Sequence, residues 1–64
     1  MHKLYYNSTS DSFEYMTDSA IHTVEFPTNV TAISLLTDEQ VPMTVDRPTA
    51  EDLMVDEWDL YINN

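Results

Sequence analysis

The clearest structural signal in the chain lies in residues 48–62, Pro-Thr-Ala-Glu-Asp-Leu-Met-Val-Asp-Glu-Trp-Asp-Leu-Tyr-Ile. Thr49-Ala50-Glu51-Asp52 has the form of a capping box directly after Pro48, and its acids suit the first turn of a helix. Apolar residues then recur at helical intervals, at Ala50, Leu53, Met54, Trp58, Tyr61 and Ile62. The stretch therefore predicts an amphipathic helix over about residues 50–61. The alternation of Trp58, Leu60 and Ile62 supports a rival interpretation, a final strand after a shorter helix.

The chain before this helix has the pattern of a small antiparallel sheet. Residues 2–7 and 13–17 are rich in aromatic side chains and flank a polar loop, so they predict a β-hairpin. Residues 20–26 alternate as a half-buried strand does, and residues 30–36 favour a strand over a helix through their β-branched side chains. Residues 41–45 contain a proline that cannot donate to a ladder, which predicts an edge strand.

These segments predict one acidic domain, residues 1–64, of the α+β class. We expect an antiparallel sheet of three to five strands, with the helix of about residues 50–61 laid across it. A chain of this length buries only about 60% of the surface that its unfolded form exposes. Since there is no cysteine, disulfides and thiolate metal sites are excluded as supports. Good packing or a homodimer must stabilise the fold instead.

The charge balance is the strongest indication of function. The chain has 12 acidic residues against 2 lysines and arginines, and its formal net charge is −10. Binding to nucleic acid or to an anionic membrane needs basic side chains, so this balance argues against both. A basic protein surface is the electrostatically suited partner. Simple solubility is the alternative explanation of the same charge.

The acids concentrate in the second half of the chain, where eight of the twelve lie between Asp38 and Asp59. On the predicted helix, Asp52, Asp56 and Asp59 stand at i, i+4 and i+7 and form a stripe of carboxylates roughly 5–6 Å apart. Such a row can take the place of a row of phosphates. We expect partner binding by this stripe, by the neighbouring acids and by one outward tyrosine, that is by Asp52, Asp56, Asp59, Glu51, Glu57, Asp38, Glu39 and Tyr5. A solvated helix face without a partner is the alternative.

No pattern in the sequence predicts catalysis, a metal site or a cofactor. The chain lacks glycine and therefore lacks a phosphate-binding loop, and it lacks a cysteine nucleophile. Ser19, His22 and Asp18 supply the residue types of a catalytic triad, but without the G-x-S-x-G elbow. We expect His22 to be tucked into the core or an interface. Because the mostly apolar run of residues 30–36 is too short to span a bilayer, we expect a cytoplasmic protein, in the host cytoplasm if a phage encodes it.

In size, charge and lack of glycine and cysteine, the chain is similar in kind to the small acidic inhibitors that bacteriophages use against host nucleases, glycosylases and defence systems. The similarity is one of composition, with no shared motif. The sequence thus predicts a DNA-mimicking inhibitor that occupies the nucleic-acid site of a DNA- or RNA-handling protein. The alternatives are an interaction module or adaptor that binds through an aromatic or apolar face, and a subunit of a homo-oligomeric assembly.

Overall fold

The computed structural model describes residues 1–63. Within them the chain forms seven strands and one helix, in the order β1 (His2–Lys3), β2 (Tyr5–Asn7), β3 (Ser12–Met16), β4 (Ile21–Thr23), β5 (Thr28–Ser34), β6 (Gln40–Val45), α1 (Arg47–Val55) and β7 (Trp58–Ile62). The predicted α+β class, with antiparallel strands and one helix near the C-terminus, is confirmed.

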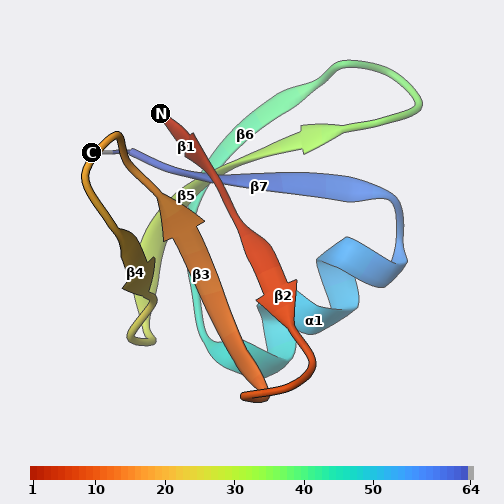
Figure 1. Cartoon of the computed structure of the whole chain (residues 1–64). Coiled ribbons are helices and arrows are strands. Elements are labelled where there is room, and N and C mark those ends of the chain that lie inside the picture. The colour runs from red at the N-terminus through yellow and green to blue at the C-terminus, as the bar shows by residue number, and fades with distance from the viewer. Residues whose placement is uncertain (64) are drawn as a thin grey trace.

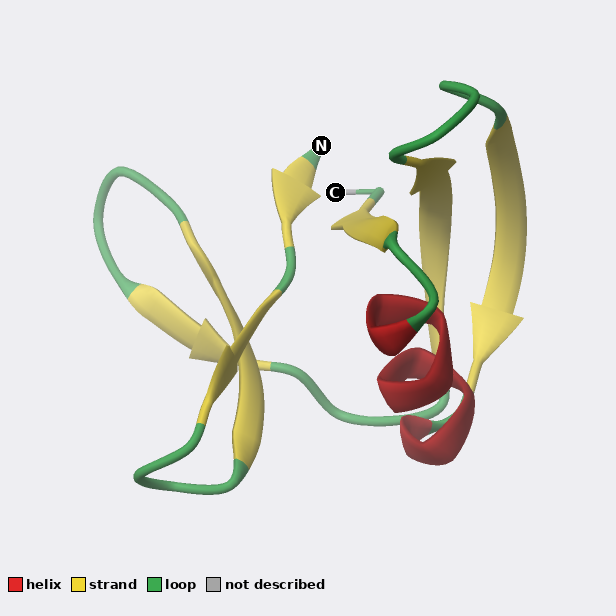
Figure 2. Ribbon diagram, turned by 90° about the vertical axis from the view of Figure 1, so that its right-hand side faces the viewer, coloured by secondary structure: helices red, strands yellow, loops and turns green. Residues whose placement is uncertain are grey.

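The strands form two sheets, where the sequence analysis expected one (Figure 1). The four-stranded sheet has the order β1-β7-β5-β6, and the three-stranded sheet has the order β2-β3-β4. Figure 2 shows α1 beside the four-stranded sheet, on the side that faces the three-stranded sheet. Leu4 lies between β1 and β2, donates its N–H to the Leu60 carbonyl oxygen at 2.7 Å, and is fully buried. The N-terminal segment thereby passes from one sheet to the other.

The predicted hairpin of residues 2–7 and 13–17 is confirmed in part. β2 pairs with β3 in antiparallel register, with Tyr6 opposite Phe13. Residues 2–3, however, pair with β7, because the buried Leu4 turns the chain from one sheet into the other. The expected edge strand is β6, which lies at one end of the four-stranded sheet and contains Pro42.

One hydrophobic core joins both sheets and the helix. Inward positions alternate along the strands, as the period of two requires. The buried apolar residues are Leu4, Phe13, Val30, Ala32, Val45, Ala50, Leu60 and Ile62. β7 supplies two of them, and it pairs with β5 on one side and with β1 on the other. The last strand is therefore central to the sheet that carries most of the core.

The predicted helix of residues 50–61 is wrong in its extent, since α1 ends at Val55 and residues 58–62 form β7. Asp56 is the C-cap, and Glu57 follows with a positive φ of 67°, which turns the chain out of the helix. Past this point, Trp58, Leu60 and Ile62 alternate toward the core, so the rival interpretation of this segment is correct. Tertiary pairing on both sides of β7 outweighs the helical spacing of the apolar residues.

The start of the helix also differs from the expected capping box at Thr49. Asp46 is the N-cap: its carboxylate accepts the Thr49 backbone N–H at 2.9 Å, and its carbonyl oxygen accepts the Ala50 N–H at 3.0 Å. Pro48 lies in the first turn, where a missing N–H costs nothing. Hydrogen bonding from the Thr49 side chain, and then from the Thr49 backbone N–H, lowers the pKa of Asp46 below its ordinary value.

Removing this cap should destabilise the protein in a pH-dependent way. We expect Asp46→Ala to lower the midpoint of thermal unfolding at pH 7 by about 4–8 °C. Asp46→Asn, which removes the same charge but keeps an acceptor for the Thr49 N–H, should stay close to the original chain. A carboxyl whose pKa is lower in the folded state stabilises the fold above its unfolded pKa, and this contribution disappears as the pH falls through the folded value. Below about pH 4 the original chain should therefore approach the asparagine variant, since a protonated Asp46 is also a neutral acceptor, and Asp46→Ala should stay less stable than both; an alanine variant as stable as the asparagine variant at pH 7 would contradict the capping role.

Candidate functional site

Two turns that are distant in sequence meet at one end of the molecule. They are the β5–β6 turn, residues 35–39, and the α1–β7 turn, residues 56–57, and together we call them the acidic tip. The Leu35 N–H donates to the Glu57 carbonyl oxygen at 2.9 Å, which joins the two turns. In Figure 1 the β5–β6 turn projects beyond the rest of the molecule, and the α1–β7 turn lies on the same side.

The conformation of the β5–β6 turn is organised by Ser34, the last residue of β5, which is buried. Its hydroxyl accepts the backbone N–H groups of Leu36 at 3.2 Å and Thr37 at 3.3 Å. Its own backbone accepts from the Asp38 N–H and donates to the Glu39 carbonyl oxygen, both at 2.9 Å. Hydrogen bonds within the chain thus fix the backbone of this turn, and residues 35–39 are all exposed to solvent.

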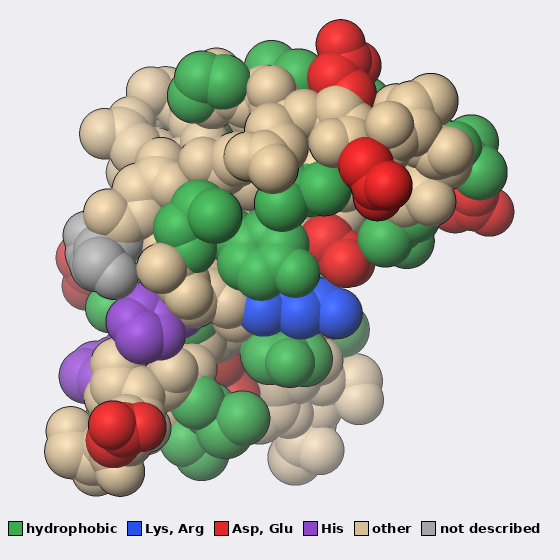
Figure 3. Space-filling model, turned by 90° about the horizontal axis from the view of Figure 1, so that it is seen from above, with side chains coloured by type: hydrophobic (Ala, Val, Ile, Leu, Met, Phe, Trp, Pro, Cys, Tyr) green, Lys and Arg blue, Asp and Glu red, His purple; other side chains and the backbone are tan. Residues whose placement is uncertain are grey.

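The acidic tip combines apolar and acidic side chains. Leu35 is 57% exposed and Leu36 is 78% exposed, although both are large hydrophobic residues. Four exposed carboxylates accompany them, on Asp38, Glu39, Asp56 and Glu57. Figure 3 shows acidic side chains gathered, with apolar ones between them, toward the end of the molecule where the β5–β6 turn lies. An exposed apolar patch with a polar rim is one mark of a protein-binding surface.

Both basic side chains of the chain are engaged away from the acidic tip. Lys3 Nζ lies 3.7 Å from Asp59 Oδ2 on the four-stranded sheet. Arg47 binds Asp11 at 2.7 Å and Glu51 at 3.0 Å, where the β2–β3 loop meets the helix. Within residues 1–63, none of the four carboxylates of the acidic tip takes part in an ion pair. Their charge is therefore uncompensated and open to a cationic partner.

The predicted binding residues divide into those that the fold brings together and those that it separates. Asp38, Glu39, Asp56 and Glu57 converge at the acidic tip. Asp52 lies one helical turn before the tip and accepts the Asp56 N–H at 3.0 Å through its carbonyl oxygen.

The remaining three lie elsewhere, and the predicted stripe does not exist. Asp59 is on β7, on the face opposite the buried Leu60, because the helix ends before it. Glu51 turns toward Arg47, and Tyr5 lies on β2, with its ring centroid 5.5 Å from Lys3 Nζ. A helical row of Asp52, Asp56 and Asp59 is therefore a wrong prediction.

Sequence analysis missed the two leucines of the acidic tip. Their signal was present, since Leu35 and Leu36 stand directly before the polar run Thr37-Asp38-Glu39-Gln40. Two adjacent leucines at a strand end cannot both face one core, because neighbouring positions on a strand point to opposite faces. The strand predicted over residues 30–36 includes both leucines, whereas β5 ends at Ser34.

The aromatic and histidine residues of the other end form a separate group. Tyr15 stacks with His2 and with His22, at centroid distances of 5.6 and 5.0 Å. His22 Nε2 also lies 3.0 Å from the Thr17 hydroxyl. In the described part of the chain, no group of three or more His, Asp or Glu side chains is arranged to hold a metal ion. Among the same residues, no helix has the length and apolar character to cross a bilayer.

The acidic tip includes residues in the left-handed backbone region that glycine normally occupies. Asp38 has φ of 60° and Glu57 has φ of 67°. Glutamate pays a steric cost there that asparagine, with its short polar side chain, largely avoids. We expect Glu57→Asn to melt about 3–6 °C above Glu57→Gln, because both variants remove the charge and only asparagine relieves the strain. Equal melting temperatures for the two amides would contradict a strained backbone at this position.

Comparison of the chain with protein families, with characterised proteins and with solved structures finds no match. The functional interpretation therefore depends on the geometry and charge of the chain itself.

Proposed function

We propose that this chain is a non-catalytic protein that binds a basic surface of a partner protein through its acidic tip. The observation that carries the proposal is the pair of exposed leucines, Leu35 and Leu36, among four carboxylates without an ion pair in the described part of the chain. The leucines supply apolar surface whose burial on binding is favourable. The carboxylates steer the approach of a cationic partner and favour its orientation.

The class of partner follows from the charge. Proteins that bind DNA or RNA carry clusters of lysine and arginine that neutralise phosphates. A chain with net charge −10 and an uncompensated acidic end competes for such a cluster. We therefore propose that the partner is a nucleic-acid-binding protein and that the chain inhibits it by occupying its nucleic-acid site. In this mimicry, carboxylates from two adjacent turns take the place of phosphates. The two leucines bind an apolar pocket of the partner beside its basic cluster.

The second candidate function is an adaptor that binds mainly by apolar contact, with its acids serving solubility. The exposure of the leucines favours it equally, and Tyr5 and Tyr6, each 48% exposed, offer further apolar contacts on opposite faces of β2. Salt separates the two functions, because screening weakens attraction between exposed charges and leaves apolar burial largely intact.

The test compares the original chain with Leu35→Ala/Leu36→Ala, both tagged and used to capture proteins from bacterial lysate. The double variant keeps every charge and the backbone hydrogen bond from position 35. We expect a nucleic-acid-binding protein that is retained by the original chain, lost by the variant, and eluted by duplex DNA or raised salt. A partner that stays bound in raised salt and in the presence of duplex DNA would support the adaptor function instead of inhibition. Equal capture by both chains would refute binding through the acidic tip.

A further inference from the structure

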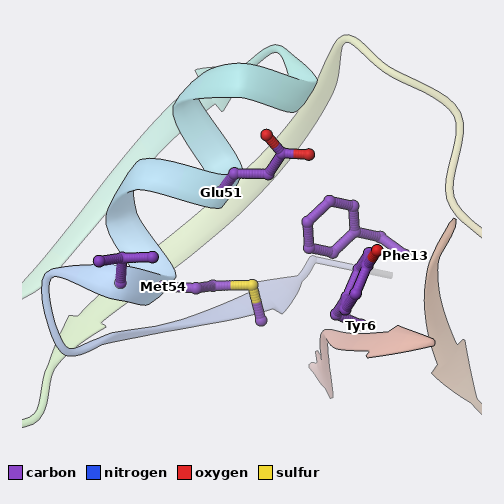
Figure 4. A pocket seen from close by; sticks show the side chains of 5 residues that line it. Tyr6, Phe13, Glu51 and Met54 are labelled. Atoms are coloured by element: carbon purple, nitrogen blue, oxygen red, sulfur yellow. The ribbon is translucent and has the colours of Figure 1, made fainter. Parts of the chain in front are cut away.

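A cavity of about 380 Å³ lies between α1 and the β2–β3 hairpin, and its lining residue Val55 directly precedes Asp56 of the acidic tip. It is lined by Tyr6, Phe13, Glu51, Met54 and Val55. Figure 4 shows the Phe13 and Tyr6 rings on the hairpin side and Met54 reaching from the helix toward them, with the Glu51 carboxylate on the helix side. The cavity thus has an apolar interior and one acidic group at its edge.

The apolar walls are aromatic on one side and flexible on the other. The Tyr6 and Phe13 rings have centroids 5.3 Å apart and are tilted by 57°. Phe13 is nearly buried, so it forms the floor, whereas Val55 is 82% exposed and stands at the rim. Aromatic faces carry negative quadrupole potential and attract cations, and a methionine side chain adapts to the shape of its neighbour. These walls suit a long aliphatic chain that ends in a positive charge.

The chain already holds one cationic side chain beside this cavity. The Arg47 guanidinium carbon lies 5.6 Å from the Phe13 ring centroid. Its Nε donates to Glu51 Oε1 at 3.0 Å, and its Nη2 donates to Asp11 Oδ1 at 2.7 Å. The hydrogen bond from the Tyr6 hydroxyl and the nearby Arg47 charge lower the pKa of Asp11, which keeps this carboxylate ionised. Because the carboxylates of Asp11 and Glu51 share the single positive charge of Arg47, the edge of the cavity has a net negative charge.

We propose that this cavity receives a lysine side chain of the basic partner. The aliphatic stem of the lysine lies against Tyr6, Phe13 and Met54, and its ammonium group meets Glu51. Lysine fits better than arginine because Glu51 Oε1 is already bound to Arg47, so the two-oxygen fork that arginine prefers is not free. A single ammonium needs only one oxygen. The inference extends the proposed function, since it adds a second anchoring point on the same basic partner.

The test uses blocked pentapeptides Ala-Ala-X-Ala-Ala with X as lysine, arginine, norleucine or glutamate, titrated into the folded chain. Methyl proton–carbon NMR spectra follow Met54, and the other three methionines, Met1, Met16 and Met43, serve as internal controls because they do not line the cavity. We expect the lysine peptide to shift Met54 at about tenfold lower concentration than norleucine, which has the same stem without the charge. Glutamate should cause no shift, and arginine should be weaker than lysine.

Glu51→Gln should reduce the apparent affinity for the lysine peptide to that of norleucine, whereas Asp52→Asn should leave it unchanged. Both variants remove one charge from the same helix, and only position 51 lines the cavity. Lysine that binds no better than norleucine, or that shifts all four methionines alike, would overturn the inference without the need for any variant. Those outcomes would leave the acidic tip untouched, because its own test depends on Leu35 and Leu36.

Discussion

Replacing Leu60 by alanine is expected to lower the free energy of unfolding by about 2–5 kcal/mol. Leu60 is fully buried on β7, between β1 and β5, and its carbonyl oxygen accepts the Leu4 N–H. Truncation removes apolar contact and leaves a cavity where both neighbouring strands meet the core. A domain of 64 residues has a total stability of only about 3–10 kcal/mol, so the variant should be largely or wholly unfolded at 37 °C.

The matched control is Leu36→Ala, the same substitution at a residue that is 78% exposed. We expect it to change the unfolding free energy by less than about 0.5 kcal/mol. Urea unfolding followed by circular dichroism measures both. If Leu60→Ala were no more damaging than Leu36→Ala, β7 could not be the central strand described above. In a helix over residues 50–61, the apolar stripe would run through Trp58 and Tyr61 and would omit position 60.

The second large effect is expected on partner association. Glu39→Lys/Glu57→Lys reverses two charges of the acidic tip and changes the net charge from −10 to −6. Electrostatic steering raises association rates by one to three orders of magnitude, so we expect the double variant to associate about tenfold or more slowly at low salt. Stopped-flow or surface-based kinetics with the captured partner give this rate, and the difference should shrink as salt increases.

The control for net charge is Asp18→Lys/Glu25→Lys, which changes the total by the same amount. Asp18 lies in the β3–β4 turn and Glu25 follows β4, both on the opposite side of the molecule in Figure 1. If overall charge alone drove association, the two double variants would slow it equally. That result would exclude the acidic tip as a specific surface, whereas a selective loss in Glu39→Lys/Glu57→Lys would support it.

Local patterns in the sequence predicted much of the secondary structure. The β2–β3 hairpin, β5 as a strand and β6 with Pro42 at an edge all follow from alternation and turn chemistry. The helix was expected in nearly the right place, yet its end was wrong because residues 58–62 fit both periods. Pairing with β5 and β1 resolves the ambiguity, and pairing between distant segments cannot be read from local spacing.

The candidate site was less predictable for the same physical reason. The concentration of acidic residues from Asp38 onward correctly indicated the C-terminal half of the chain. Four of the predicted binding residues do meet, at the acidic tip. Their meeting depends on the hydrogen bond between Leu35 and Glu57, which joins turns that are 22 positions apart. The cavity likewise brings Tyr6 and Phe13 against residues 51–55 through the closure of two sheets around one core. Contacts between residues so distant in the sequence have no local sequence motif from which they could be predicted.

Hydrogen–deuterium exchange of the chain, free and bound to its captured partner, tests the central claim most directly. Residues 35–39 and 56–57 are exposed, and most of their amides are held in hydrogen bonds within the two turns. Such turns exchange through local opening, and a partner seated on the acidic tip should slow that opening and hence the exchange. We predict strong protection of these two turns, with little change across β4, which contributes to neither the acidic tip nor the cavity. Protection confined to β3 and β4, with the acidic tip exchanging as in the free chain, would contradict the account.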